Sequence, residues 1–73
     1  MPYINVQVTR EGVMPQQKRA IIAGVTRLMM DILNKDPRTT HVIIQEIDTD
    51  NWGVGGEPVT ELRSRQQNNQ PKP

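Results

Sequence analysis

Cysteine and phenylalanine are absent from this chain of 73 residues, and it has one histidine, one tryptophan and one tyrosine. Without cysteine no disulfide can form, and a single histidine cannot build a zinc site. A chain of this length makes one small domain, whose core contributes only about 3–5 kcal/mol to stability. We therefore expect the chain to gain the rest of its stability by associating with copies of itself.

An excess of charge of one sign and a long apolar run are also missing. Nine Lys and Arg residues oppose eight Asp and Glu residues, for a formal net charge of +1. This charge is too small to indicate a basic surface that binds nucleic acid. No apolar run approaches the ~18–20 residues of a membrane span. The first residues lack the charged and apolar regions of a signal peptide. We expect a cytoplasmic protein that binds neither nucleic acid nor membranes.

Residues 3–9 alternate between polar and apolar side chains. Ile4, Val6 and Val8 share one face of this segment, and a period of two is typical of a β-strand. The apolar face should meet a helix, whereas the polar face need not be in contact with bulk water. Residues 10–14 follow as a loop.

A long amphipathic helix is predicted after this loop. Pro15 suits the first turn, where its missing N–H is not needed, and apolar residues then recur at helical spacings for about three turns: Ile21, Ile22, Val25, Leu28, Met29, Ile32 and Leu33. Gly24 lies within the stripe and costs up to ~1 kcal/mol relative to alanine, so we expect another backbone to approach closely there. The helix should end near residues 34–35, because Pro37 disfavours helical backbone at the residue before it.

Residues 41–47 include four β-branched residues and indicate a second strand, buried on both faces. Strand, helix and strand form a right-handed β-α-β unit with parallel strands and the helix on one face. The opposite face would carry Ile43 and Ile47 or, in the reverse orientation, Val42 and Ile44. Because a parallel sheet is rarely exposed on one side, we expect a partner's sheet to cover it. Two units joined edge to edge would make a four-stranded sheet, and stacked dimers would form a closed oligomer.

The C-terminal third is rich in turn-forming residues. Residues 48–57 could hold a small hairpin. Trp52 lies in this loop, where its position alone favours a role at a core edge or an interface over a role in a pocket wall. Residues 58–65 could form one helical turn, and the polar residues 66–73 are expected to be disordered. We therefore divide the chain into a domain at 1–65 and a tail at 66–73.

Met1 and Pro2 stand directly before the first predicted strand. Initiator methionine is usually removed when the next residue is small, and removal would leave Pro2 as a free secondary amine. Burial disfavours the charged form of an amine and lowers its pKa, and the unperturbed α-amino pKa is already about 8. Pro2 is therefore a candidate general base or nucleophile, although proline is common at the second position and usually has no such role.

Several motifs together give a specific resemblance. Pro2 opens a strand, Glu11-Gly12 follows it, Gln17-Lys18 opens the helix, Ile43-Ile44 and Glu46 lie in the second strand, and Trp52-Gly53-Val54-Gly55-Gly56-Glu57 forms the last loop. In this combination the chain resembles the small 4-oxalocrotonate tautomerase family over about residues 2–62.

The resemblance implies an α+β fold: a single β-α-β unit with two parallel strands, one long helix and a small C-terminal hairpin. It implies assembly through dimers, each with a ferredoxin-like sheet, into a homohexamer. It also implies removal of Met1 and acid–base catalysis by Pro2, which would move a proton between an enol oxygen and a carbon of a small unsaturated 2-keto acid. No metal or cofactor takes part in that chemistry.

The sequence departs from the family pattern at two positions that bind substrate carboxylates. The best-studied members carry arginines where this chain has Val13 and His41. Arg10 and Arg38 are close in sequence and could replace them, or could be ordinary solvated charges. His41 could donate to a substrate oxygen, or could merely cap or pack. Because the family places a large aromatic residue in the last loop, the resemblance favours Trp52 as a pocket wall.

Three functions follow from this pattern. The first, which we favour, is a tautomerase or isomerase that uses Pro2. The second is a hydratase, dehalogenase or decarboxylase of an unsaturated acid on the same fold, with Glu11, Glu46 or Glu57 activating water. The third is a non-catalytic, small oligomeric binding protein. Retention of Met1 would favour the third, because an acylated proline nitrogen is not basic.

Overall fold

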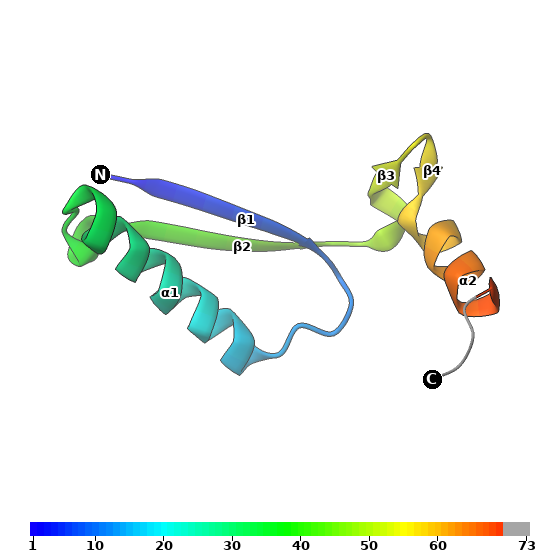
Figure 1. Cartoon of the computed structure of the whole chain (residues 1–73), viewed down its shortest axis with the longest axis horizontal. Coiled ribbons are helices and arrows are strands. Elements are labelled where there is room, and N and C mark those ends of the chain that lie inside the picture. Colours follow the sequence, from blue (N-terminus) through cyan, green and yellow to red (C-terminus); the bar gives the residue numbers. More distant parts are fainter. Residues whose placement is uncertain (70–73) are drawn as a thin grey trace.

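The computed structural model describes residues 1–69 and contains a β-α-β unit followed by a C-terminal arm (Figure 1). The unit consists of β1 (Tyr3–Thr9), α1 (Pro15–Leu33), the 3-10 helix η1 (Pro37–Thr39) and β2 (His41–Ile47). β2 runs parallel to β1 along its whole length. The predicted α+β class and both predicted strands are confirmed, with the strand bounds as expected.

α1 begins and ends where the sequence predicts. At its start, the Gln17 side chain accepts a hydrogen bond from the backbone N–H of Met14, 2.8 Å away, and Pro15 occupies the first turn. At its end, Asn34 adopts a left-handed conformation with φ of 55°. Its backbone N–H then bonds the carbonyl of Met30 at 3.0 Å, which satisfies one of the last free carbonyls of the helix.

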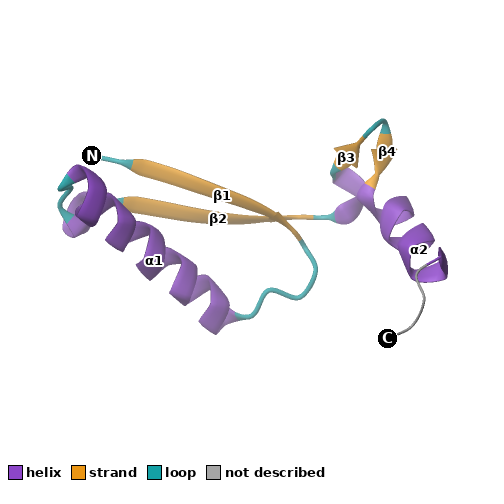
Figure 2. Cartoon of the chain, viewed as in Figure 1, coloured by secondary structure: helices purple, strands orange, loops and turns teal. Residues whose placement is uncertain are grey.

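α1 covers one face of the two-stranded sheet, as Figure 2 shows. The residues of that face pair in register across the strands, Ile4 with Val42 and Val6 with Ile44, and all four are half-buried. Lys18 of α1 forms an ion pair with Glu46 of β2 on the same face. This alternation leaves the opposite face bare, so the structure selects one of the two orientations that the sequence left open.

The bare face of the sheet is mostly polar, but it also carries Tyr3 at one end, 63% exposed, and Ile43 near its middle. Asn5 and Gln7 of β1 both donate to the side-chain oxygen of Gln45, at 2.9 and 3.0 Å. Ile43 stands on the same face with 41% of its surface exposed. Nothing in the described part of the chain covers this face.

The C-terminal arm, residues 49–69, projects away from the β-α-β unit (Figure 1). It contains the 3-10 helix η2 (Thr49–Asn51), the antiparallel strands β3 (Gly53–Val54) and β4 (Glu57–Pro58), and α2 (Val59–Asn69). Gly55 and Gly56 make the hairpin turn with φ of 61° and 86°, values that favour glycine. The predicted hairpin is confirmed.

α2 is longer than the single turn expected from the sequence. It continues to Asn69 and so includes the first residues of the segment predicted as a disordered tail. Its Glu, Leu, Arg and Gln residues have high helix propensity, which the polar composition of the segment concealed. Residues 70–73 of that segment lie outside the described residues, and the division of the chain at residue 65 stays a prediction.

The single chain has almost no core of its own. Among the described residues only Val59 is buried, with 4% of its surface exposed, whereas Ile32 of α1 is 69% exposed and Leu28 is 50% exposed. The radius of gyration is 16.3 Å, although a compact chain of this length would have about 11 Å. A β-carbon at Gly24 would touch nothing within 4 Å, so the described chain does not itself make the close approach predicted there. In the part of the chain that the structure describes, no helix combines the length and apolarity of a membrane span.

Candidate active site

Three of the predicted site residues lie near the N-terminal end of the sheet. Pro2 is half-buried, and its carbonyl accepts a hydrogen bond from the backbone N–H of His41, 3.0 Å away. Arg38 belongs to η1, just before β2, and its guanidinium bonds the carboxylate of Asp36 at 3.0 Å. This bond lowers the pKa of the Asp36 carboxyl. The Arg38 side chain is 87% exposed, so within one chain it is a solvated ion pair.

The other two predicted site residues lie at the opposite end of the sheet. Arg10 follows β1 and bonds the Asp48 carboxylate at 2.8 Å and the Glu46 carbonyl at 3.3 Å. Trp52 follows η2 and is half-buried. The seven residues of β1 separate Pro2 from Arg10, and eight extended steps correspond to about 25 Å. The residues proposed for one site therefore form two groups that do not meet within one chain.

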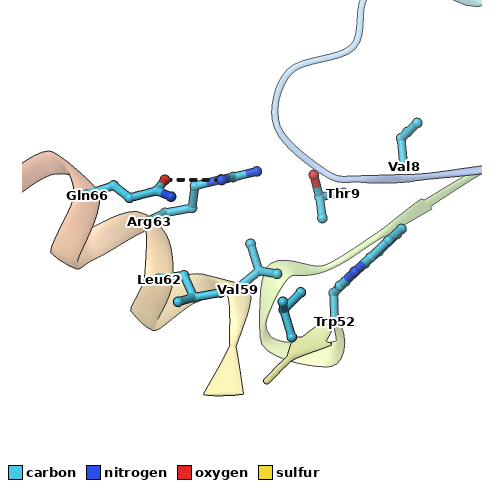
Figure 3. A pocket seen from close by; sticks show the side chains of 8 residues that line it. Val8, Thr9, Trp52, Val59, Leu62, Arg63 and Gln66 are labelled. Atoms are coloured by element: carbon cyan, nitrogen blue, oxygen red, sulfur yellow. Dashed lines mark hydrogen bonds between the residues drawn. The ribbon is translucent and has the colours of Figure 1, made fainter. Parts of the chain in front are cut away.

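A cavity of about 480 Å³ opens where the arm faces the end of β1. β1 contributes Val8 and Thr9, and the arm contributes Trp52, Val59 and Arg63, among others (Figure 3). Most of the lining side chains are apolar. Trp52 therefore lies in a pocket wall of this chain.

Arg63 is a lining residue that the sequence analysis missed. Its Nε and Nη2 donate to the two carboxylate oxygens of Glu11 at 2.8 and 3.2 Å, and its Nη1 donates to the Gln66 oxygen at 3.2 Å. Thr9 also donates to Glu11. The bonds from Arg63 and then Thr9 lower the pKa of the Glu11 carboxyl, and Glu11 in turn raises the pKa of Arg63.

The signal that could have identified Arg63 is a helical spacing in the last segment. Residues 59, 62, 63 and 66 lie at i, i+3, i+4 and i+7, and all four line the cavity. Because the sequence analysis allowed only one helical turn between residues 58 and 65, this face was not recognised.

The three carboxylates considered for activating water are all bonded to cations. Glu11 pairs with Arg63, Glu46 with Lys18, and Glu57 with Arg65. The hydrogen bond from Lys18 is the largest cause that lowers the pKa of Glu46, and a lowered pKa weakens a general base. Among the residues that the structure describes, no group of three or more His, Cys, Asp or Glu side chains is placed to hold a metal ion.

Comparisons with known proteins agree on one family. A family model described as "Tautomerase enzyme" matches residues 2–62. The probable tautomerase K2 of Dickeya dadantii is 55% identical over 65 residues, which cover 89% of this chain and 97% of that protein. The 2-hydroxymuconate tautomerase of Comamonas testosteroni is 31% identical over 62 residues, or 85% of this chain and 97% of that protein. The crystal structure of DmpI from Helicobacter pylori superposes with a TM-score of 0.82 at 43% identity, covering 86% of this chain and 97% of that one.

Proposed function

The chain belongs to the tautomerase family, and on that premise we propose that Pro2 is its acid–base catalyst. The enzyme is an isomerase, and we propose that it moves a proton between the enol and keto forms of a small unsaturated 2-keto acid or a similar enolisable carbonyl compound. Removal of Met1 would free the nitrogen of Pro2. The observation that carries the proposal is the bond from the His41 N–H to the Pro2 carbonyl, which fixes the proline at the end of the sheet.

A secondary amine at this place suits an isomerisation. Its unperturbed pKa is about 8, and apolar surroundings favour the neutral form. A base with a pKa near neutrality can both accept the proton from the enol oxygen and return it to carbon. Pro2 is half-buried in the single chain, and a second subunit over this end of the sheet would exclude more water.

A relative and the pocket both support the proposed substrate class. The name of the Comamonas testosteroni protein specifies 2-hydroxymuconate, an enol acid. The cavity beside Trp52 offers apolar walls for an unsaturated carbon chain and one cation, Arg63. This combination supports a small planar acid as the substrate.

A complete site requires two chains, because Pro2 and Trp52 lie at opposite ends of β1. In a two-fold dimer whose sheets join edge to edge, the strands at the junction run antiparallel. The Pro2 end of one chain then lies beside the Trp52 end of its partner. We propose such a homodimer as the catalytic unit, and stacking of dimers by their bare sheet faces into a hexamer. A cytoplasmic location stays a prediction.

No observation favours the competing functions. A hydratase or dehalogenase needs a group that activates water, and the three glutamates considered for this role are each bonded to Lys or Arg. A non-catalytic role would be favoured by retention of Met1, which would leave the Pro2 nitrogen acylated and not basic.

The direct test is to replace Pro2 by alanine. The variant Pro2→Ala should lose most of the ketonisation of a 2-hydroxydienoate, whereas Pro15→Ala, which alters the exposed start of α1, should keep it. Intact mass of the protein from its own host should show that Met1 has been removed. Unchanged turnover by Pro2→Ala, or retained Met1, would contradict the proposed role of Pro2.

A further inference from the structure

Arg63 is the one charged residue among the described residues that line the cavity at the end of β1. Two other lining residues, Thr9 and Gln66, are polar but uncharged, and the remaining ones are apolar. Arg10 is close in sequence to this end of β1, but it is bonded to Asp48 and does not line the cavity. An anion that entered the cavity would therefore find its positive charge on Arg63.

The guanidinium of Arg63 is held in one orientation and is not fully used. A guanidinium has five N–H donors. Two of them bond Glu11 and one bonds Gln66, which leaves one hydrogen on each terminal nitrogen without a partner among the described residues. Two such hydrogens match the two oxygens of a carboxylate. Figure 3 shows the side chain extending from α2 toward Thr9, across the cavity.

We propose that Arg63 binds the substrate carboxylate in this pocket and makes the enzyme prefer carboxylates to their uncharged analogues. The inference rests on the proposed function for the class of substrate. It assigns to α2 the role that the sequence analysis looked for in Arg10, Arg38 and His41. Glu11 orients the guanidinium, and its negative charge offsets the positive charge of Arg63, so Glu11 limits the affinity of the pocket for anions.

The Glu11–Arg63 pair also joins α2 to the loop after β1. The competing explanation for the pair is that it only stabilises the position of the arm. The two explanations predict opposite effects of removing the charge of Glu11. If Arg63 binds an anion, Glu11→Gln leaves a more positive pocket and tightens anion binding. If the pair only holds the arm in place, Glu11→Gln loosens the pocket and weakens the binding of charged and uncharged ligands alike.

Binding of 2,4-hexadienoate and of its uncharged amide tests the proposal, with the fluorescence of Trp52, the one tryptophan of the chain, as the readout. Arg63→Gln should weaken binding of the acid about tenfold or more and that of the amide less than twofold. Arg63→Lys keeps the charge without the fork and should fall between Arg63→Gln and the parent. Glu11→Gln should bind the acid more tightly and the amide equally well. Arg65→Gln is the matched control, since Arg65 lies on the same helix, pairs with Glu57 and does not line the cavity.

An unchanged ratio of acid to amide affinity in Arg63→Gln would overturn the proposal, and so would weaker binding of both ligands by Glu11→Gln. The same measurements on Pro2→Ala separate this inference from the proposed function. If Pro2→Ala binds both ligands like the parent but the parent itself shows no turnover, the proposed catalysis fails while the role of Arg63 stands. If turnover depends on Pro2 but the preference for the acid over the amide does not depend on Arg63, the proposed catalysis stands and the role of Arg63 fails.

Discussion

Pro2 and Trp52 lie at opposite ends of β1 in the same chain. Pro2 precedes Tyr3, the first residue of the strand, whereas Trp52 shares its cavity with Val8 and Thr9 at the other end. Seven residues of extended strand span more than about 20 Å, which is beyond the reach of one small substrate. Catalysis that uses both residues therefore requires a second chain.

Mixing two inactive variants should restore activity. Pro2→Ala lacks the proposed base and Trp52→Ala lacks a pocket wall, so each homo-oligomer should be nearly inactive. When the two chains are unfolded and refolded together, half of the dimers are mixed, and each mixed dimer has one intact site of two. About a quarter of the parental activity should return if sites are shared across a two-fold dimer. Activity no greater than the average of the two variants would show that each site lies within one chain.

A charge in the middle of the bare sheet face should prevent assembly beyond the dimer. Ile43 is 41% exposed in the single chain, and we propose that stacked dimers bury it. Ile43→Asp would place an unpaired carboxylate in that interface, at a cost of several kcal/mol. Sedimentation velocity should show a smaller particle than the parent. Gln16→Asp, which adds the same charge at the exposed start of α1, should sediment like the parent.

Replacing Gly24 should test the surface of α1. Alanine is favoured over glycine within a helix by up to ~1 kcal/mol, and the single chain has open space at this position. If another subunit approaches closely there, Gly24→Ala should raise the dissociation constant of the oligomer in spite of the better helix. If α1 is free at Gly24, thermal stability should rise and assembly should not change.

Stability should fall in acid because of the ion pair between α1 and β2. The hydrogen bond from Lys18 lowers the pKa of Glu46 below its ordinary value of 4.5. A carboxyl whose pKa is lower in the folded state stabilises that state above the unfolded pKa, and the stabilisation disappears as the pH falls through the folded pKa. Thermal denaturation between pH 7 and pH 3 should show a smaller decrease for Glu46→Gln than for the parent. The control Glu61→Gln, at an exposed position of α2, should follow the parent.

The sequence was sufficient for the elements whose side-chain period is strong. The alternation from Tyr3 to Thr9 predicted β1 because one face packs on α1 and the other does not. The long apolar stripe predicted α1, and Asn34 with Pro37 defined its end. α2 was underpredicted because its segment is polar, and polarity alone does not distinguish an exposed helix from a disordered tail.

The candidate site was only partly accessible from the sequence. Pro2 was identified as a candidate because its position after Met1 would make its nitrogen a free secondary amine once Met1 is removed. Arg10 and Arg38 were selected by closeness in sequence to family positions, but in the structure both are bonded to aspartates. Arg63 is more than fifty residues from Glu11, its partner, and only the path of the arm brings the two together.

The near absence of an enclosed core makes folding depend on protein concentration. Val59 is the one buried residue among the described residues, so a newly made chain has few stabilising contacts until it meets another. Folding and assembly then obey one mass-action law, and dilution should lower the melting temperature. In a cell that makes little of this protein, a larger fraction of the chains would be unfolded and open to proteases. The lifetime of the protein would then depend on its own abundance.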